Sequence, residues 1–194
     1  DLDPGHIDVI ILATSSPDRI QPATATRVQK ELGASKAFAF DINSVCTGGV
    51  YAIHMADMMI RAGAYTNILV VAAEVYSRFL NPQDISTYPY FGDGAGALLF
   101  QACEQSVGVL GSVLHSDGAG MDLIQVPAGG TMKPYEEMEK DTDRFFQMRG
   151  RDVYQFAVQK APEVIVELLQ NTRMDLSDVK CIVPHQANIN IVKS

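Results

Sequence analysis

The chain has 194 residues, of which 47% are hydrophobic and 20% are charged, and its formal net charge is −8. This composition is typical of a globular protein with enough apolar material for a core. The acidic balance argues against nucleic-acid binding, which needs a basic surface. No apolar run is long enough to predict a membrane-spanning helix. The three cysteines, Cys46, Cys103 and Cys181, lie far apart, so we expect no disulfide framework and no metal site, and infer a reduced, cytoplasmic setting.

The first half of the chain is predicted to alternate between strands and helices. Continuous apolar runs favour strands that are covered on both faces, as in parallel α/β sheets. Strands are expected at residues 6–15, 36–42, 67–75, 98–100 and 107–115, and helices at 22–33 and 46–63. The second of these helices is apolar nearly all round, so we expect it to be central and buried.

A glycine cluster, FGDGAGA at residues 91–97, precedes one of these strands. Such a cluster can cradle a phosphate, but this one lacks the strand-then-helix context of a dinucleotide loop and the lysine of a P-loop. The favoured interpretation is therefore a tight turn with close packing.

The second half begins with a polar segment. Its glycines and glutamates predict a surface flap or a domain connector. An amphipathic helix is expected at residues 150–172, kinked or divided by Pro162, and then a short strand at 180–184 that leads to His185 and a further helix. We accordingly divide the chain into an N-terminal half at 1–126, a connector at 127–149 and the start of a C-terminal half at 150–194.

Cys46 is the leading candidate for a nucleophile. It follows an apolar run and a polar turn and precedes a helical pattern, which places its thiol at the start of a helix. The helix dipole and the unpaired backbone N–H groups there favour the thiolate. Gly48 and Gly49 leave the backbone bare, so a substrate can approach closely. The alternative is a small buried cysteine on a packed helix.

His185 is the candidate partner of this cysteine. Sites in α/β sheets form at the carboxyl ends of strands, and Cys46 and His185 both follow an expected strand. A cysteine beside an imidazole is a geometry that several acyl-transfer chemistries share. His54 lies on the polar stripe of its helix, and His115 at a strand end is interpreted as a hydrogen-bonded structural histidine.

Four segments together resemble the thiolase-like condensing enzymes, and most of all the β-ketoacyl-acyl-carrier-protein synthase III family. They are DINSVCTGGVYA at 41–52, FGDGAGA at 91–97, MRGRDVYQFA at 148–157 and PHQAN at 184–188. The resemblance implies a layered αβαβα thiolase-like α/β fold with mixed, mostly parallel sheets, whose first half carries the nucleophilic cysteine and whose second half carries the catalytic histidine. Because the family is longer at both ends, it also implies a fragment, incomplete at both ends, with the third catalytic residue expected beyond Ser194.

The same resemblance implies an acyltransferase that starts fatty-acid or polyketide-like synthesis. Cys46 would take the acyl group from an acyl-CoA, and His185 would act on a malonyl thioester carried by acyl carrier protein. Gly48 and Asn188 would contact the substrate, although Asn188 also suits a helix cap. No metal and no redox cofactor is implied, since the CoA thioester is a substrate, and the family is homodimeric.

Two other interpretations stay open. A related CoA acyltransferase or a hydroxymethylglutaryl-CoA-synthase-like enzyme would keep Cys46 and His185 and change the acceptor. A non-catalytic fragment that binds a partner protein would explain why the family's third catalytic residue, an asparagine, has no counterpart here. Asn190 stands where many relatives have an arginine that receives the carrier, which weakens the expectation of a carrier-protein partner.

Overall fold

The computed structural model describes residues 2–105 and 107–194. They form two compact units that interleave along the chain: Asp1–Val75 with Gly92–Val109, and Tyr76–Phe91 with Leu110–Ser194. The domain boundaries expected at residues 126 and 149 stay a prediction. Each unit is described by itself.

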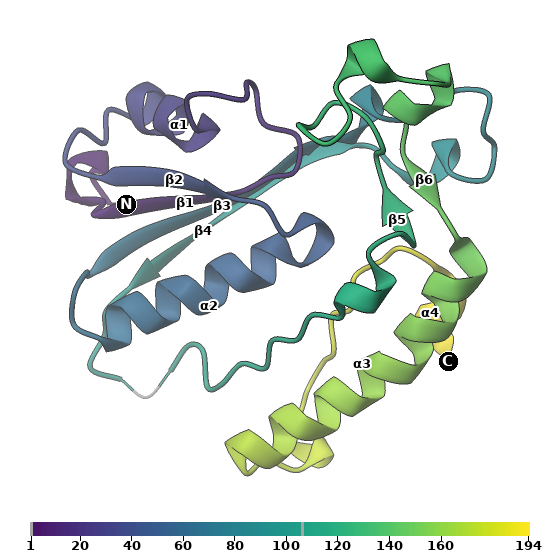
Figure 1. The fold of residues 1–194 in the computed structure, drawn as a ribbon. Helices are drawn as coiled ribbons and strands as arrows, with labels where there is room; N and C mark the ends of the chain where they lie inside the picture. Colours follow the sequence, from purple (N-terminus) through teal and green to yellow (C-terminus); the bar gives the residue numbers. More distant parts are fainter. Residues whose placement is uncertain (1, 106) are drawn as a thin grey trace. The chain divides into compact units, whose positions relative to one another are not determined.

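The first unit is built on a four-stranded sheet with the order β2-β1-β3-β4 (Figure 1). Its strands are Val9–Ala13 (β1), Phe38–Ile42 (β2), Asn67–Val75 (β3) and Asp93–Gln101 (β4). β1 is parallel to both β2 and β3, and β4 is antiparallel to β3. The predicted mixed, mostly parallel sheet is therefore confirmed for this unit.

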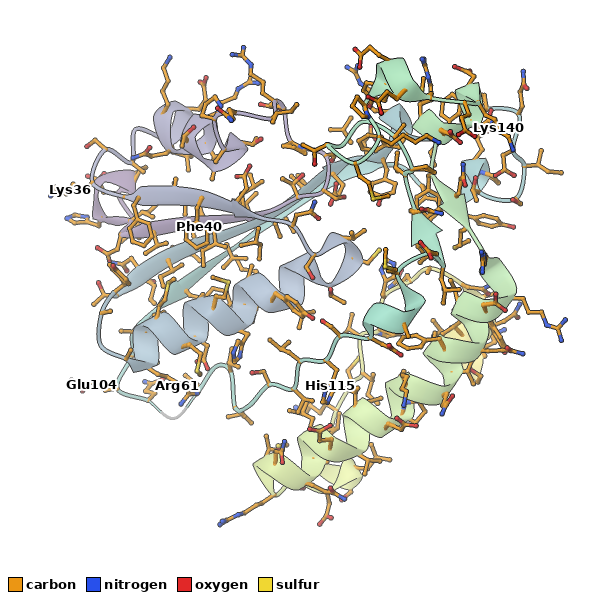
Figure 2. The ribbon with its side chains drawn as sticks, viewed as in Figure 1. Lys36, Phe40, Arg61, Glu104, His115 and Lys140 are labelled. Atoms are coloured by element: carbon orange, nitrogen blue, oxygen red, sulfur yellow. The ribbon has the colours of Figure 1, made fainter. Side chains whose placement is uncertain are left out.

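One helix covers each face of this sheet, α1 (Thr24–Leu32) on one side and α2 (Gly48–Arg61) on the other (Figure 1). All residues of the inner strand β1 are buried, which explains its continuous apolar run. Val9 and Ile11 point toward α2, and Ile10 and Leu12 point toward α1, because side chains alternate along a strand. Phe40 of β2 also packs on the α2 side (Figure 2). The result is a three-layered α/β arrangement.

The start of α1 is held by a carboxylate from the neighbouring strand. The two carboxylate oxygens of Asp41 accept hydrogen bonds from the backbone N–H groups of Thr24 and Ala25, at 2.7 and 2.8 Å. A negative charge at a helix N-terminus is favoured by the helix dipole. The helix ends at Gly33, whose φ of 72° is the left-handed conformation that glycine adopts readily.

Asp8 joins the beginnings of β1 and β3. Its Oδ2 accepts hydrogen bonds from the backbone N–H groups of Thr66 and Asn67, both at 2.9 Å, and from the Thr66 hydroxyl at 3.0 Å. These hydrogen bonds lower the pKa of Asp8, and the bond from the backbone N–H of Asn67 has the largest effect. Since folding favours the charged carboxylate, this stabilisation is present above the ordinary pKa of aspartate and is lost as the pH falls through the lower pKa of the folded state.

We therefore expect Asp8→Asn to lower the unfolding temperature at neutral pH and to lose this effect below about pH 4. Calorimetric scans across this pH range measure the difference from the wild type. Asp122→Asn, at an exposed position, serves as the control and should follow the wild type throughout. A difference between Asp8→Asn and the wild type that stays constant with pH would contradict the role of the charge.

Two expectations for residues 91–115 are wrong. The FGDGAGA segment is not a tight turn, because β4 already begins at Asp93, and Gly94 and Gly96 pair with Glu74 and Ala72 of β3. The neighbouring strand supplies the hydrogen bonds that hold these glycines extended. The strand expected at residues 107–115 is not formed, since none of the described strands pairs with these residues.

The second unit contains a short antiparallel pair, β5 (Ile124–Gln125) and β6 (Gln147–Met148), and the helices α3 (Gly150–Thr172) and α4 (Ile189–Lys193). α3 continues through Pro162, so the expected division of this helix is wrong. Proline removes one backbone donor, and the other turns of the 23-residue helix keep it continuous. The strand expected at 180–184 is also absent from the described residues.

The segment expected to be a surface flap is partly buried within this unit. Lys133 Nζ donates to Asp143 Oδ2 at 2.7 Å, and the backbone N–H of Ala128 donates to the carbonyl oxygen of Asp143 at 2.9 Å. Ala128 and Asp143 are both buried. The segment is therefore folded onto itself.

In the described part of the chain, no helix has both the length and the apolar character needed to cross a membrane.

Candidate active site

Cys46 lies in a tight turn between β2 and α2, as the strand–turn–helix pattern predicts. A 3₁₀ turn covers Val45–Thr47, and α2 begins directly after it. Thr47 closes the turn, because its N–H and its hydroxyl both donate to the carbonyl oxygen of Ser44, at 3.1 and 2.8 Å. The residue Cys46 is exposed at the surface, although neighbouring atoms surround part of it.

The residue before the cysteine has a strained backbone. Val45 has a φ of 45°, in the left-handed region that a β-branched residue rarely adopts. Such strain costs on the order of 1–3 kcal/mol and gathers at functional sites. The sequence contains no signal for this feature, because valine is a poor residue for such a turn.

The first turn of α2 rests directly on the sheet. A Cβ placed on Gly48 would lie 3.2 Å from the Cβ of Ala13 in β1, and one placed on Gly49 would lie 3.8 Å from the Cβ of Ala72 in β3. Gly48 is buried, so its bare backbone serves this close packing. The contact of Gly48 with a substrate stays a prediction.

The surroundings of Cys46 influence the ionisation of its thiol. Partial burial raises the pKa of Cys46, the negative charge of Glu74 raises it further, and the residue's own backbone N–H opposes both effects. Cys46 stands in the 3₁₀ turn directly before α2. The expected effect of the helix dipole on its thiol stays a prediction.

The other two predicted site residues, His185 and Asn188, lie in the second unit. His185 is exposed in an irregular stretch that precedes α4. Asn188 is the N-cap of α4, and its Oδ1 accepts a hydrogen bond from the N–H of Asn190 at 2.8 Å. The helix-cap alternative is confirmed, and the contact of Asn188 with a substrate stays a prediction. Cys46 and Gly48 belong to the first unit.

The remaining polar candidates have structural partners. His115 Nε2 lies 2.7 Å from Glu167 Oε2 within the second unit. This contact confirms the prediction that His115 is a hydrogen-bonded histidine. Figure 2 labels its position. Arg61, at the end of α2, pairs with Asp57 at 2.7 Å. Across residues 2–105 and 107–194, no cluster of three or more His, Cys, Asp or Glu side chains is placed to hold a metal ion.

The fold and the first half of the site define a thiolase-like α/β protein with a cysteine at the carboxyl end of a strand. Residues 40–118, which include Cys46, match the family described as 3-oxoacyl-[acyl-carrier-protein] synthase III.

Curated relatives and solved structures agree with this match. The chain is 41% identical over all of its length to the β-ketoacyl-[acyl-carrier-protein] synthase III of Roseiflexus castenholzii, and it covers 59% of that protein. It is 45% identical to synthase III 3 of Streptomyces coelicolor, with 98% of this chain and 58% of that protein covered. The crystal structure of the Aquifex aeolicus synthase III superposes with a TM-score of 0.88 at 34% identity, over 99% of this chain and 58% of that one.

These comparisons show that the chain is similar in sequence to 3-oxoacyl-[acyl-carrier-protein] synthase III and shares its fold. The chain spans a little under three fifths of the length of these relatives.

Proposed function

We propose that the protein is an acyltransferase of the synthase III type, which condenses an acyl-CoA primer with a malonyl thioester. The observation that carries this proposal is the exposed Cys46 on its strained turn after β2. The whole length of this chain is similar to part of these synthases. The reaction would start fatty-acid synthesis, or a related polyketide-like pathway.

The chemistry follows from the thiol and the two thioesters. The Cys46 thiolate attacks the carbonyl carbon of the acyl-CoA, the CoA thiolate leaves, and the acyl group stays on sulfur. The malonyl thioester then loses CO₂, and its enolate carbon attacks the acyl-cysteine. A carbon–carbon bond forms, the Cys46 thiolate is expelled, and a β-ketoacyl thioester is released.

His185 is proposed to assist the second step. A neutral imidazole that donates a hydrogen bond to the thioester oxygen stabilises the negative charge that develops there, and one such donor is typically worth about 3 kcal/mol. The backbone N–H of Cys46 would serve the oxyanion in the first step. No metal or redox cofactor enters these steps, because the substrates supply both the electrophile and the carbon nucleophile.

We further infer that the protein works in the cytoplasm as a homodimer with an acyl-carrier-protein-bound malonyl group. Three free cysteines support a reducing compartment. The position of β2 at the edge of the sheet supports pairing with a second copy.

Intact-mass spectrometry after incubation with a panel of acyl-CoAs tests the proposal. We expect the mass to rise by one acyl group with the preferred primer, and we expect a malonyl thioester to discharge that group as a β-ketoacyl product. Discharge of an intact acyl group to another acceptor would instead favour a simple CoA acyltransferase. If no acyl-CoA adds mass, either to this chain or to one extended to the length of the relatives, the proposal is wrong.

A further inference from the structure

The hydroxyl groups of Ser44 and Thr47 enclose the turn that carries Cys46. The backbone N–H and the hydroxyl of Thr47 both donate to the carbonyl oxygen of Ser44, at 3.1 and 2.8 Å. The two hydroxyl oxygens lie 3.1 Å apart. Because the hydrogen of the Thr47 hydroxyl already points to the carbonyl oxygen, the Ser44 hydroxyl is the donor in this contact. These three hydrogen bonds form a clamp between Ser44 and Thr47.

The clamp encloses two residues, the strained Val45 and the candidate nucleophile Cys46. Val45 has a φ of 45°, and a β-branched residue keeps such a conformation only where its surroundings hold it there. The backbone N–H of Gly48 donates to the carbonyl oxygen of Val45, so the turn leads directly into α2. The clamp therefore restricts the backbone on both sides of Cys46, and with it the directions of the thiol and of the Cys46 N–H.

The same pair of bonds occurs at the start of α1. The backbone N–H and the hydroxyl of Thr26 donate to the carbonyl oxygen of Ala23, at 3.1 and 2.7 Å. The two residues that these bonds enclose, Thr24 and Ala25, belong to the regular helix α1. The bonding pattern alone is thus a structural feature of a helix start. The clamp at Thr47 differs in what it encloses, which is a strained residue and an exposed cysteine.

We propose that Thr47 is a positioning residue for Cys46: its hydroxyl holds the turn closed, so that the thiol and the backbone N–H of Cys46 keep the orientation that attack on a thioester requires. Reaction rates depend steeply on orientation, because a displacement of about 1 Å can cost about a hundredfold in rate. The proposal deepens the proposed function, since its catalytic meaning rests on Cys46 as the nucleophile.

Single-turnover acylation by the preferred acyl-CoA tests the catalytic part of this role. Thr47→Val keeps the branched shape and removes the hydroxyl, so the acylation rate at saturating acyl-CoA should fall about fivefold or more. The half-saturating concentration should stay within about twofold, because the lost hydrogen bond lies within the turn. Thr47→Ser keeps both donors and should restore the wild-type rate.

Thr26→Val is the matched control, because it removes a hydroxyl with the same bonding pattern at the start of α1. It should be acylated at the wild-type rate. Either of two results would overturn the proposal: wild-type acylation of Thr47→Val, or a Thr47→Ser protein that is as slow as Thr47→Val.

Amide hydrogen exchange, followed by NMR, tests the clamp without any acyl donor. Loss of one hydrogen bond raises the population of the opened turn about fivefold. The protection factors of the amides at positions 47 and 48 should therefore fall by about this factor in Thr47→Val, whereas Thr26→Val should loosen only the start of α1. Unchanged protection at both positions in Thr47→Val would overturn the proposal.

Thr47 is exposed, so we expect Thr47→Val to fold and to keep the circular dichroism spectrum of the wild type. Should it fail to fold, Thr47→Ala removes the same hydroxyl with a residue that favours helices. It should show the same losses of acylation rate and of protection, and a fully active Thr47→Ala would overturn the proposal.

The two measurements separate this proposal from the proposed function. A wild-type protein that accepts no acyl group, at this length or extended to the length of the relatives, would contradict the proposed function, and hydrogen exchange would then decide by itself whether Thr47 holds the turn. A protein that is acylated equally well in all variants would support the proposed function and overturn the role of Thr47.

Discussion

Cys46→Ser should abolish the gain of one acyl mass that we expect of the wild-type chain with its preferred acyl-CoA. A serine hydroxyl is a weak nucleophile unless a base activates it, whereas a thiolate attacks a thioester directly. The substitution exchanges sulfur for oxygen at an exposed position in the 3₁₀ turn, so we expect the fold to be kept. Intact-mass spectrometry before and after addition of the acyl-CoA measures the loss.

The chain supplies two matched controls for this experiment. Cys103 and Cys181 are also free and exposed, so Cys103→Ser and Cys181→Ser remove a comparable thiol away from the turn at the start of α2. Both variants should keep the full mass gain. An acyl adduct at full stoichiometry in Cys46→Ser would show that another group is the nucleophile.

Ile11→Ala should reduce the free energy of unfolding by about 2–5 kcal/mol, the range found for large-to-small substitutions in a core. Ile11 is 0% exposed on the inner strand β1, and it packs in one cluster with Ala52 and Ala56 of α2. The change removes apolar contacts and leaves a cavity between the sheet and the helix whose first turn supports Cys46. Urea denaturation followed by circular dichroism measures the effect.

Ile20→Ala makes the same chemical change at a residue that is 93% exposed. Its effect on the free energy of unfolding should stay within about 0.5 kcal/mol, as for most surface substitutions. Similar losses in the two variants would mean that burial beneath α2 does not account for the stability of the first unit.

Long segments with a clear hydrophobic period were predictable from the sequence. The strand at 67–75 and the helix at 150–172 have the predicted bounds. Both patterns are local, because the residues that define the period lie within the element itself. The candidate nucleophile was predictable in the same way, since the order of apolar run, polar turn and glycines places Cys46 between a strand and a helix.

Elements that depend on a distant partner were not predictable in this way. The glycines of FGDGAGA are extended because β3 pairs with them, and residues 107–115 form no strand because none of the described strands lies beside them. A strand needs a neighbour for its hydrogen bonds, and the sequence does not say which neighbour is present. Pro162 is tolerated because the surrounding turns of α3 hold the helix together.

The sequence by itself determined the α/β class, the positions of the main elements and the cysteine in the turn before α2. The tertiary structure alone decided which groups surround that cysteine. Ala72 is 23 positions from Gly49 along the chain, and only the folding of β3 beneath the first turn of α2 brings these two residues into contact. The sequence cannot show such a contact, because distance between residues and exclusion of water are properties of the folded chain.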